Sequence, residues 1–80
     1  MERPEIEAEV LRVLTEEFEL EAFGPTSDSH LGEDLDLDSL DIVDLWTTLE
    51  QVFDLRLDEE QFISDMTVSD LVDYLVTELA

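Results

Sequence analysis

The chain contains no cysteine among its 80 residues. A disulfide, a thiolate metal site and a cysteine nucleophile are therefore excluded. A domain of this size buries only about 60% of the surface that its unfolded chain exposes, so its core is small and has no cross-link to support it. We expect residues 1–80 to form a single domain.

Positive charge is almost missing. The chain has no lysine, and Arg3, Arg12 and Arg56 stand against 24 acidic residues, which gives a formal net charge of −21 at pH 7. We expect no nucleic acid and no anionic membrane surface as a partner, because contacts with phosphate need cationic side chains. The charge favours protein partners with basic patches, and association with them that weakens as salt is added.

Long apolar runs are also missing. No stretch is long enough to span a membrane, and the N-terminus lacks the basic-then-apolar order of a signal sequence. Six aromatic residues and a hydrophobic content of 44% argue against a disordered acidic tail. We therefore expect a folded monomer in the cytoplasm.

The apolar residues that are present recur at three- and four-residue steps, which is the period of a helix and not of a strand. We predict helices over residues 4–19, 39–53 and 59–64, and a last helix from the capping sequence Thr67-Val68-Ser69-Asp70 to about Leu79. The expected class is all-α, a small four-helix bundle with three longer helices, a short third helix and a long loop over 20–37. The expected buried residues are Ile6, Val10, Val13, Leu14, Phe18, Ile42, Leu45, Trp46, Leu49, Phe53, Phe62, Ile63, Val68, Leu71, Val72, Leu75 and Leu79, with Leu20, Phe23, Leu31 and Leu35 pinning the loop.

The stretch from Leu35 to Asp44 leads out of this loop into the helix over 39–53. Asp38 suits the N-cap, because its carboxylate can accept hydrogen bonds from the free N–H groups of the first turn. Asp41 adds negative charge at the positive end of the helix dipole. Ser39 then lies in the first turn with its hydroxyl outward, where a phosphate ester would be favoured. The arrangement suits a modified attachment serine better than a nucleophile, and a serine in a first turn is also ordinary capping chemistry.

A serine nucleophile is disfavoured, because it needs an activating base and an orienting partner. The one histidine, His30, lies in the loop and is expected to be exposed, and the chain has no Gly-x-Ser-x-Gly elbow. The alternating Asp34, Asp36 and Asp38 suggest a calcium loop. Its required glycine and glutamate are replaced by Ser39 and Leu45, so we expect no metal site, and a calcium sensor is the weakest alternative.

Asp38-Ser39-Leu40-Asp41, followed by a helix that ends in Leu49-Glu50-Gln51-Val52-Phe53, resembles the acyl carrier proteins, and the resemblance runs over nearly all of the chain. It implies that Ser39 carries 4′-phosphopantetheine, whose thiol holds acyl groups as thioesters, and that the chain is not itself an enzyme. It also implies that Asp38 helps a phosphopantetheinyl transferase (holo-synthase) to hold Mg²⁺ while Ser39 is modified.

The helix over 39–53 has a second apolar patch, Leu40, Val43 and Thr47, which a helix with one buried face does not need. Acidic residues flank this patch. By resemblance, this surface docks on basic patches of synthase and acyltransferase enzymes. The residues of this predicted docking face are Leu40, Asp41, Val43, Asp44, Thr47 and Glu50, beside Asp38.

Two features depart from the housekeeping fatty-acid members of the family. Leu55-Arg56-Leu57-Asp58 lacks their usual Ile-Pro, and Leu37 stands where small residues are frequent. Fatty acid synthesis and a specialised polyketide, lipid or aminoacyl and peptidyl pathway therefore both stay open. An acidic adaptor of the same fold, without a cofactor, is the alternative from another class. We also hypothesise that Trp46 shapes the cavity that receives the acyl chain.

Overall fold

The computed structural model describes residues 2–57 and 66–79. These ranges contain α1 (Arg3–Arg12), the π-helical η1 (Val13–Glu17), the 3₁₀ turn η2 (Glu21–Phe23), α2 (Ser39–Phe53) and α3 (Val68–Leu79). The only strand-like pairing among them is an isolated antiparallel bridge between His30 and Thr67. The all-α class is confirmed. The predicted short helix over 59–64, with Phe62 and Ile63, lies outside the described residues.

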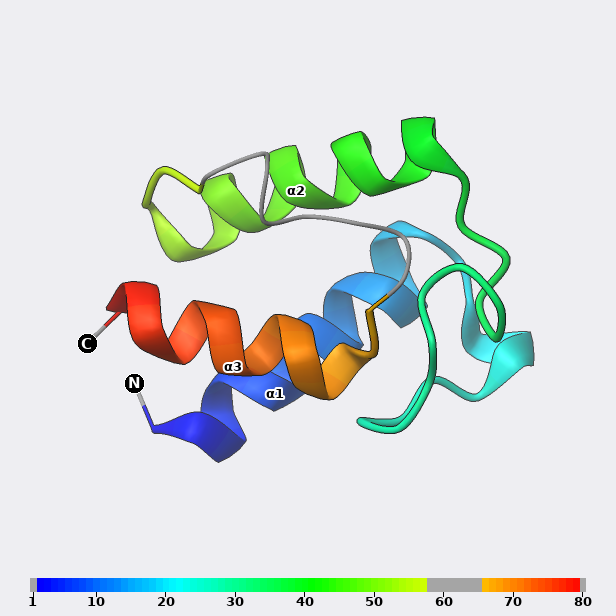
Figure 1. Ribbon diagram of the computed structural model, residues 1–80, viewed down its shortest axis with the longest axis horizontal. Coiled ribbons are helices and arrows are strands. Elements are labelled where there is room, and N and C mark those ends of the chain that lie inside the picture. Colours follow the sequence, from blue (N-terminus) through cyan, green and yellow to red (C-terminus); the bar gives the residue numbers. More distant parts are fainter. Residues whose placement is uncertain (1, 58–65, 80) are drawn as a thin grey trace.

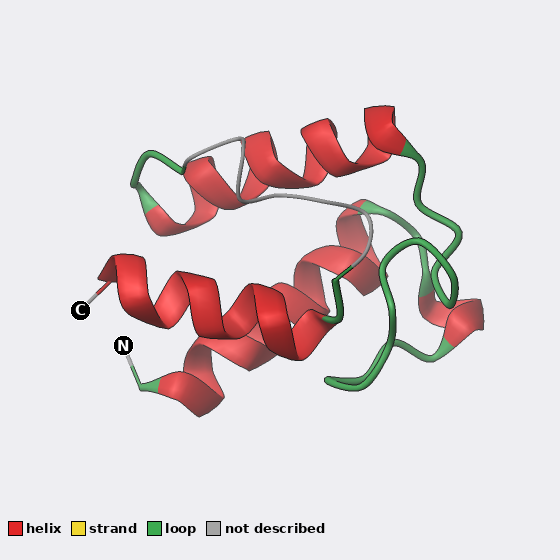
Figure 2. Cartoon of the chain, in the orientation of Figure 1, coloured by secondary structure: helices red, strands yellow, loops and turns green. Residues whose placement is uncertain are grey.

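The helices form a small layered bundle. α1 and α3 pack side by side and run in opposite directions, and α2 lies on one side of this pair (Figure 1). The loop between η2 and α2 gathers at the end of the bundle where α2 begins, and both termini lie at the opposite end (Figure 2). The fold therefore places the start of α2 far from the chain ends.

The first helix ends differently from the prediction. Regular α geometry stops at Arg12, and in the next turn the Phe18 N–H donates to the Val13 carbonyl, five residues back, at 3.2 Å. The Thr15 hydroxyl donates to the Leu11 carbonyl at 3.0 Å, a local bond that competes with the regular ladder. Glu19 has a φ of 55°, which ends the helix. The predicted continuous helix over 4–19 is therefore corrected to α1 followed by the π turn η1.

The core is one cluster built from all three helices and the loop. Ile6, Val10, Val13 and Leu14 bury the inner face of the first helical segment, as their spacing predicted. α2 contributes Ile42, Leu45, Leu49 and Phe53, and α3 contributes Val68, Leu71, Val72 and Leu75. Phe18, Trp46 and Leu79 were expected inside but are only partly buried, at the edge of this cluster.

Three apolar side chains tie the long loop to the core, as predicted: Leu20, Leu31 and Leu35 are buried. Phe23 was expected to be a fourth, but it is 51% exposed, because the short turn η2 carries its ring outward. Backbone hydrogen bonds fix the rest of the loop to the start of α3. The Leu31 N–H donates to the Met66 carbonyl at 2.9 Å, and the Val68 N–H donates to the Ser29 carbonyl at 2.9 Å.

The start of α3 carries the predicted capping box. The Asp70 N–H donates to Thr67 Oγ1 at 3.1 Å, and the Thr67 N–H donates to Asp70 Oδ2 at 3.0 Å. Arg3 in the first turn of α1 forms an ion pair with Asp73 of α3, which joins the two helices. In the parts of the chain that the structure describes, no helix is both long and apolar enough to cross a membrane.

Candidate functional site

Two buried leucines lie in the loop just before α2. Leu35 and Leu37 point into the core, and the Leu37 N–H donates to the Leu31 carbonyl at 3.1 Å. Asp36 between them has a φ of 55°, a left-handed conformation that is costly for most residues and tolerated by aspartate. Because Leu35 and Leu37 are both buried, the bend at Asp36 between them is held in place, and so is the start of α2 that follows.

A reciprocal capping box then starts α2. The Asp41 N–H donates to Asp38 Oδ1 at 2.9 Å, and the Asp38 N–H donates to Asp41 Oδ2 at 3.2 Å. This confirms Asp38 as the N-cap. Asp41 does more than complement the dipole, because its carboxylate closes the box. The box holds the first turn of α2 in a fixed geometry.

Ser39 is the first residue of α2 and is exposed. Its hydroxyl has no hydrogen-bond partner within residues 2–57 and 66–79, so nothing in this part of the chain restrains or activates it. The fold therefore presents Ser39 on a rigid helix end at the surface. This is the geometry that attachment of a bulky group requires.

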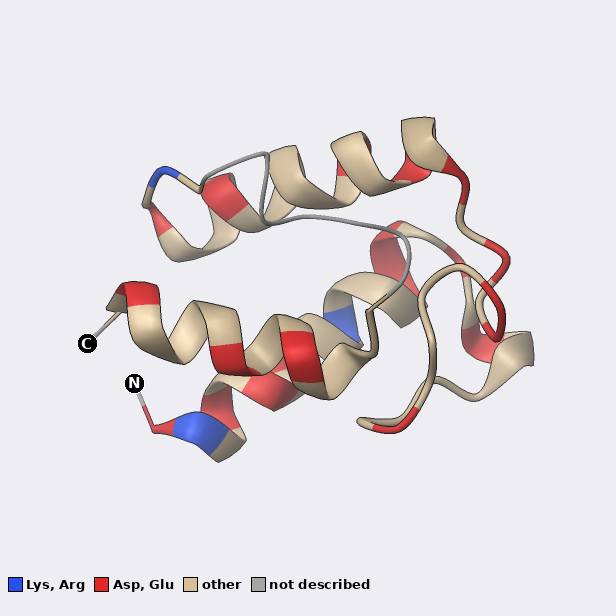
Figure 3. Ribbon diagram, in the orientation of Figure 1, with Lys and Arg blue, Asp and Glu red and all other residues tan. Residues whose placement is uncertain are grey.

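The surroundings of Ser39 are acidic. Figure 3 shows acidic residues on both sides of the start of α2, whereas the arginines lie at the two ends of α1 and beyond the end of α2. The free N–H groups of the first turn and the helix dipole favour a phosphate at this position, but the nearby carboxylates oppose it. A phosphate at this position would therefore have backbone N–H groups as partners, but no arginine side chain among the described residues.

The predicted docking face is largely at the surface. Leu40 is 75% exposed and Val43 is 42% exposed, high values for apolar side chains in so small a domain. Asp44 and Thr47 are exposed as well. Asp41 and Glu50 are half-buried, because each carboxylate accepts a backbone N–H: Asp41 from Asp38, and Glu50 from Leu57 at 2.9 Å.

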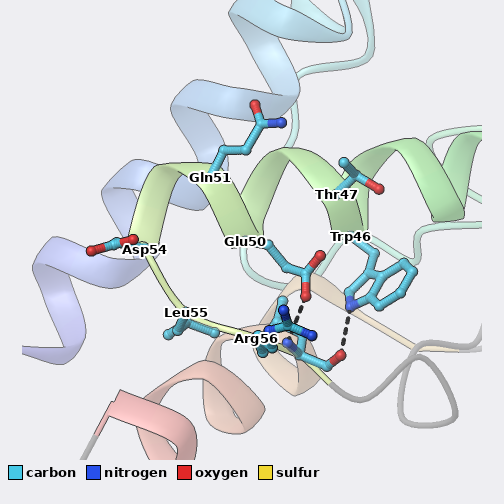
Figure 4. Close-up of a pocket in the computed structure, with 8 residues that line it drawn as sticks. Trp46, Thr47, Glu50, Gln51, Asp54, Leu55 and Arg56 are labelled. Carbon is cyan, nitrogen blue, oxygen red and sulfur yellow. Dashed lines mark hydrogen bonds between the residues drawn. The ribbon is translucent and has the colours of Figure 1, made fainter.

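The position of Trp46 differs from the prediction. It was expected in the buried stripe of α2, but the structure puts it at the edge of the core, where its Nε1–H donates to the Leu57 carbonyl at 3.1 Å. The Glu50 carboxylate accepts the N–H of Leu57, so two side chains of α2 bind the carbonyl and the N–H of that residue (Figure 4). The helical period alone could not reveal this contact, because it depends on the path of the chain after α2.

Trp46 also lines a surface pocket of about 570 Å³ at the C-terminal half of α2 (Figure 4). Its lining combines the apolar residues Trp46, Leu55 and Leu57 with the polar Thr47 and Gln51 and the charged Glu50, Asp54 and Arg56. No pattern in the sequence indicates this pocket, because it forms between α2 and the segment that folds back after it.

His30 and Arg12 have structural roles. His30 was expected to be exposed but is half-buried, and its Nδ1 accepts the Glu33 N–H at 3.0 Å. Arg12 forms ion pairs with Glu9 and Glu16, both at 3.1 Å. Its hydrogen bond to Glu9, and to a smaller extent that to Glu16, raises the pKa of the Arg12 guanidinium. Within the described residues no group of three or more His, Asp or Glu side chains could hold a metal ion.

Comparison with known proteins matches residues 6–75 to the family model described as "Phosphopantetheine attachment site". A protein of Coprothermobacter proteolyticus named "Acyl carrier protein" is 40% identical over 79 residues, which cover 99% of this chain and 96% of that protein. "Acyl carrier protein" of Amoebophilus asiaticus is 36% identical, with 95% of each chain covered. "Acyl carrier protein 2" of Ralstonia nicotianae is 35% identical over the full chain and 99% of that protein. No solved structure matches significantly.

Proposed function

Because this chain belongs to the acyl carrier protein family, we propose that Ser39 is the residue that carries its 4′-phosphopantetheine. Acyl carrier proteins are carriers and not enzymes, so the chain presents cargo to catalytic sites on other proteins. The observation that supports Ser39 is its exposed hydroxyl at the first position of α2, directly after the capped Asp38.

Attachment transfers the phosphopantetheine part of coenzyme A to the Ser39 oxygen in one step. The oxygen forms a bond to the phosphorus on the pantetheine side, the bond from that phosphorus to the adenosine bisphosphate portion breaks, and the hydroxyl loses its proton. No base contacts Ser39 within the described residues, so the transferase has to accept that proton. When bound, the group supplies a thiol that holds acyl cargo as a thioester.

We further propose that the predicted docking face of α2 binds the transferase and the enzymes that use the cargo. Exposed Leu40 and Val43 offer apolar contact area at the edge of an acidic surface, a combination that suits a partner with a basic rim around an apolar centre. Asp38 is the residue proposed to help hold Mg²⁺ during modification. Its Oδ1 accepts the Asp41 N–H, and its other carboxylate oxygen stays available to a cation.

The proposed cargo is an acyl intermediate of fatty acid synthesis or of a specialised polyketide or lipid pathway. The departures at Leu37 and at Leu55-Arg56-Leu57 support a specialised pathway. Leu37 is buried under the bend before α2, and Leu57 is held by Trp46 and Glu50, so both departures are part of the packing around α2.

Intact-mass measurement after incubation with coenzyme A and a promiscuous phosphopantetheinyl transferase tests the attachment site. The wild-type chain should gain the mass of one phosphopantetheine, and Ser39→Ala should gain none. Ser69→Ala is the control, because Ser69 also lies in the first turn of a helix, α3, and should not be modified. An unmodified wild-type chain would instead favour the cofactor-free adaptor.

A further inference from the structure

Arg56 stands apart from the other two arginines of the chain. Arg3 and Arg12 both form ion pairs with carboxylates. Arg56 is exposed, and its side chain has neither an ion pair nor a hydrogen bond with any of residues 2–57 and 66–79. The chain has 24 acidic residues, so an arginine that stays unpaired among the described ones is unusual for it. Its guanidinium is therefore available to a carboxylate of another molecule.

The surface pocket that Arg56 lines contains two carboxylates, and neither of them pairs with it. The Glu50 carboxylate accepts the Leu57 N–H at 2.9 Å, so it is already engaged. Asp54 ends α2 in a left-handed conformation and forms no ion pair with Arg56. The pocket therefore holds a cation that its own acidic residues do not bind.

The backbone around Arg56 is held in place. The Leu55 N–H before it donates to the Glu50 carbonyl at 3.1 Å, and Trp46 and Glu50 bind both backbone groups of Leu57 after it (Figure 4). A side chain on a fixed segment has less freedom to lose when it binds, so less of the binding energy is spent on ordering. The fold therefore presents this guanidinium from a fixed point.

The pocket continues the predicted docking face, because Thr47 and Glu50 belong to both. A partner that covers that face therefore comes within reach of Arg56. A carboxylate on such a partner would be repelled by acidic residues such as Asp44, but it would be attracted at Arg56. The indole of Trp46, which also lines the pocket, offers an apolar wall to the methylene groups of a glutamate side chain.

We propose that Arg56 selects among partner proteins by binding a glutamate side chain that stands within an otherwise basic docking surface. The planar guanidinium can hold a carboxylate through two parallel hydrogen bonds. A basic partner with a lysine at the same place would instead meet a like charge, which adds discrimination against it. This inference rests on the proposed docking face and adds the chemistry of the partner that it prefers.

Two synthetic peptides serve as probes: acetyl-Lys-Lys-Leu-Glu-Leu-Lys-Lys-amide, and the same peptide with glutamine in place of glutamate. Their affinities for the wild-type chain, Arg56→Gln and Arg12→Gln are measured by titration at about 0.15 M salt, where long-range attraction is screened. Trp46, the single tryptophan of the chain, gives the fluorescence signal, and backbone amide chemical shifts locate the bound peptide. Circular dichroism confirms that the variants are folded.

The net charge of the chain alone favours the glutamine peptide, because that peptide is the more positive of the two. A carboxylate bound by Arg56 predicts the opposite order. We expect the wild-type chain to bind the glutamate peptide more tightly, and the ratio of the two affinities to fall roughly two- to fivefold in Arg56→Gln. Arg12→Gln removes the same charge from α1, so it should keep the wild-type ratio.

The proposal is overturned if Arg56→Gln leaves the ratio unchanged, if Arg12→Gln lowers it equally, or if neither peptide shifts the amide signals of the pocket residues. These failures are distinct from failure of the docking face itself. Slower modification of Ser39 in Asp44→Lys, together with an unchanged ratio in Arg56→Gln, would refute the selecting role of Arg56 alone.

Discussion

Asp38 carries two roles that substitutions can separate. As the N-cap it accepts the Asp41 N–H at 2.9 Å, and as the residue before Ser39 it is proposed to help hold Mg²⁺ during modification. Asp38→Ala removes both roles. Asp38→Asn keeps a side-chain oxygen that can cap the helix, because asparagine and aspartate are about equally good N-caps, but it removes the carboxylate that would bind the cation.

The size of the effect follows from the capping box. Loss of an aspartate cap costs about 1 kcal/mol, and in a domain of this size that corresponds to a fall in Tm of roughly 4–8 °C. We expect this fall for Asp38→Ala and a Tm close to wild type for Asp38→Asn. Both variants should be modified much more slowly than wild type by the transferase in the presence of Mg²⁺.

Thermal unfolding followed by circular dichroism gives the Tm, and timed intact-mass measurements give the rate of modification. Thr67→Ala is the control for capping alone, since it breaks the corresponding box at α3 and leaves Ser39 untouched. It should lower Tm without slowing modification of the folded protein. The reasoning is wrong if Asp38→Asn loses as much stability as Asp38→Ala, or if it is modified at the wild-type rate.

Three further predictions follow from the structure. Asp44→Lys should slow modification of Ser39, because it reverses a charge on the docking face. It should leave Tm nearly unchanged, because Asp44 is exposed and outside the capping box. Glu78→Lys on α3 is the control, and equal modification rates of the two variants would show that Asp44 does not belong to the docking face. Asp54→Gly should raise the unfolding free energy by roughly 1 kcal/mol, because Asp54 caps α2 at a φ of 51°. Asp54→Ala removes the same charge without relieving the conformation, so an equal gain there would point to charge instead. Added NaCl, and MgCl₂ more steeply, should raise Tm by screening the net charge of −21, and a constant Tm would contradict this.

The local features of the fold could be predicted because they depend on residues close together in the sequence. The cap at Asp38 and the capping box at Thr67 and Asp70 each involve residues three positions apart, and the structure contains both. The buried stripes of α2 and α3 follow from the helical period, which the apolar residues repeat. The exposure of Ser39 follows from its place after the cap.

Features that depend on contacts between distant segments could not be predicted. Phe23 has a large apolar side chain of the kind usually found in a core, but the path of the chain through η2 turns its ring to the solvent. The loop is fixed because its backbone pairs with residues 66–69, far along the chain, and no periodic pattern marks such pairing. The π turn η1 likewise depends on where the chain must go after Val13.

The amino-acid sequence by itself determined that this protein is acidic, helical and capped at Asp38, with Ser39 presented in the first turn of a helix. Each of these properties depends on charge, period or neighbours within one helical turn. Only the tertiary structure decided that Trp46 and Glu50 hold Leu57, and that a pocket therefore forms on the face of α2 that begins at Ser39. That outcome required the chain to fold back on α2, and the position of a returning segment is set by packing and not by local pattern.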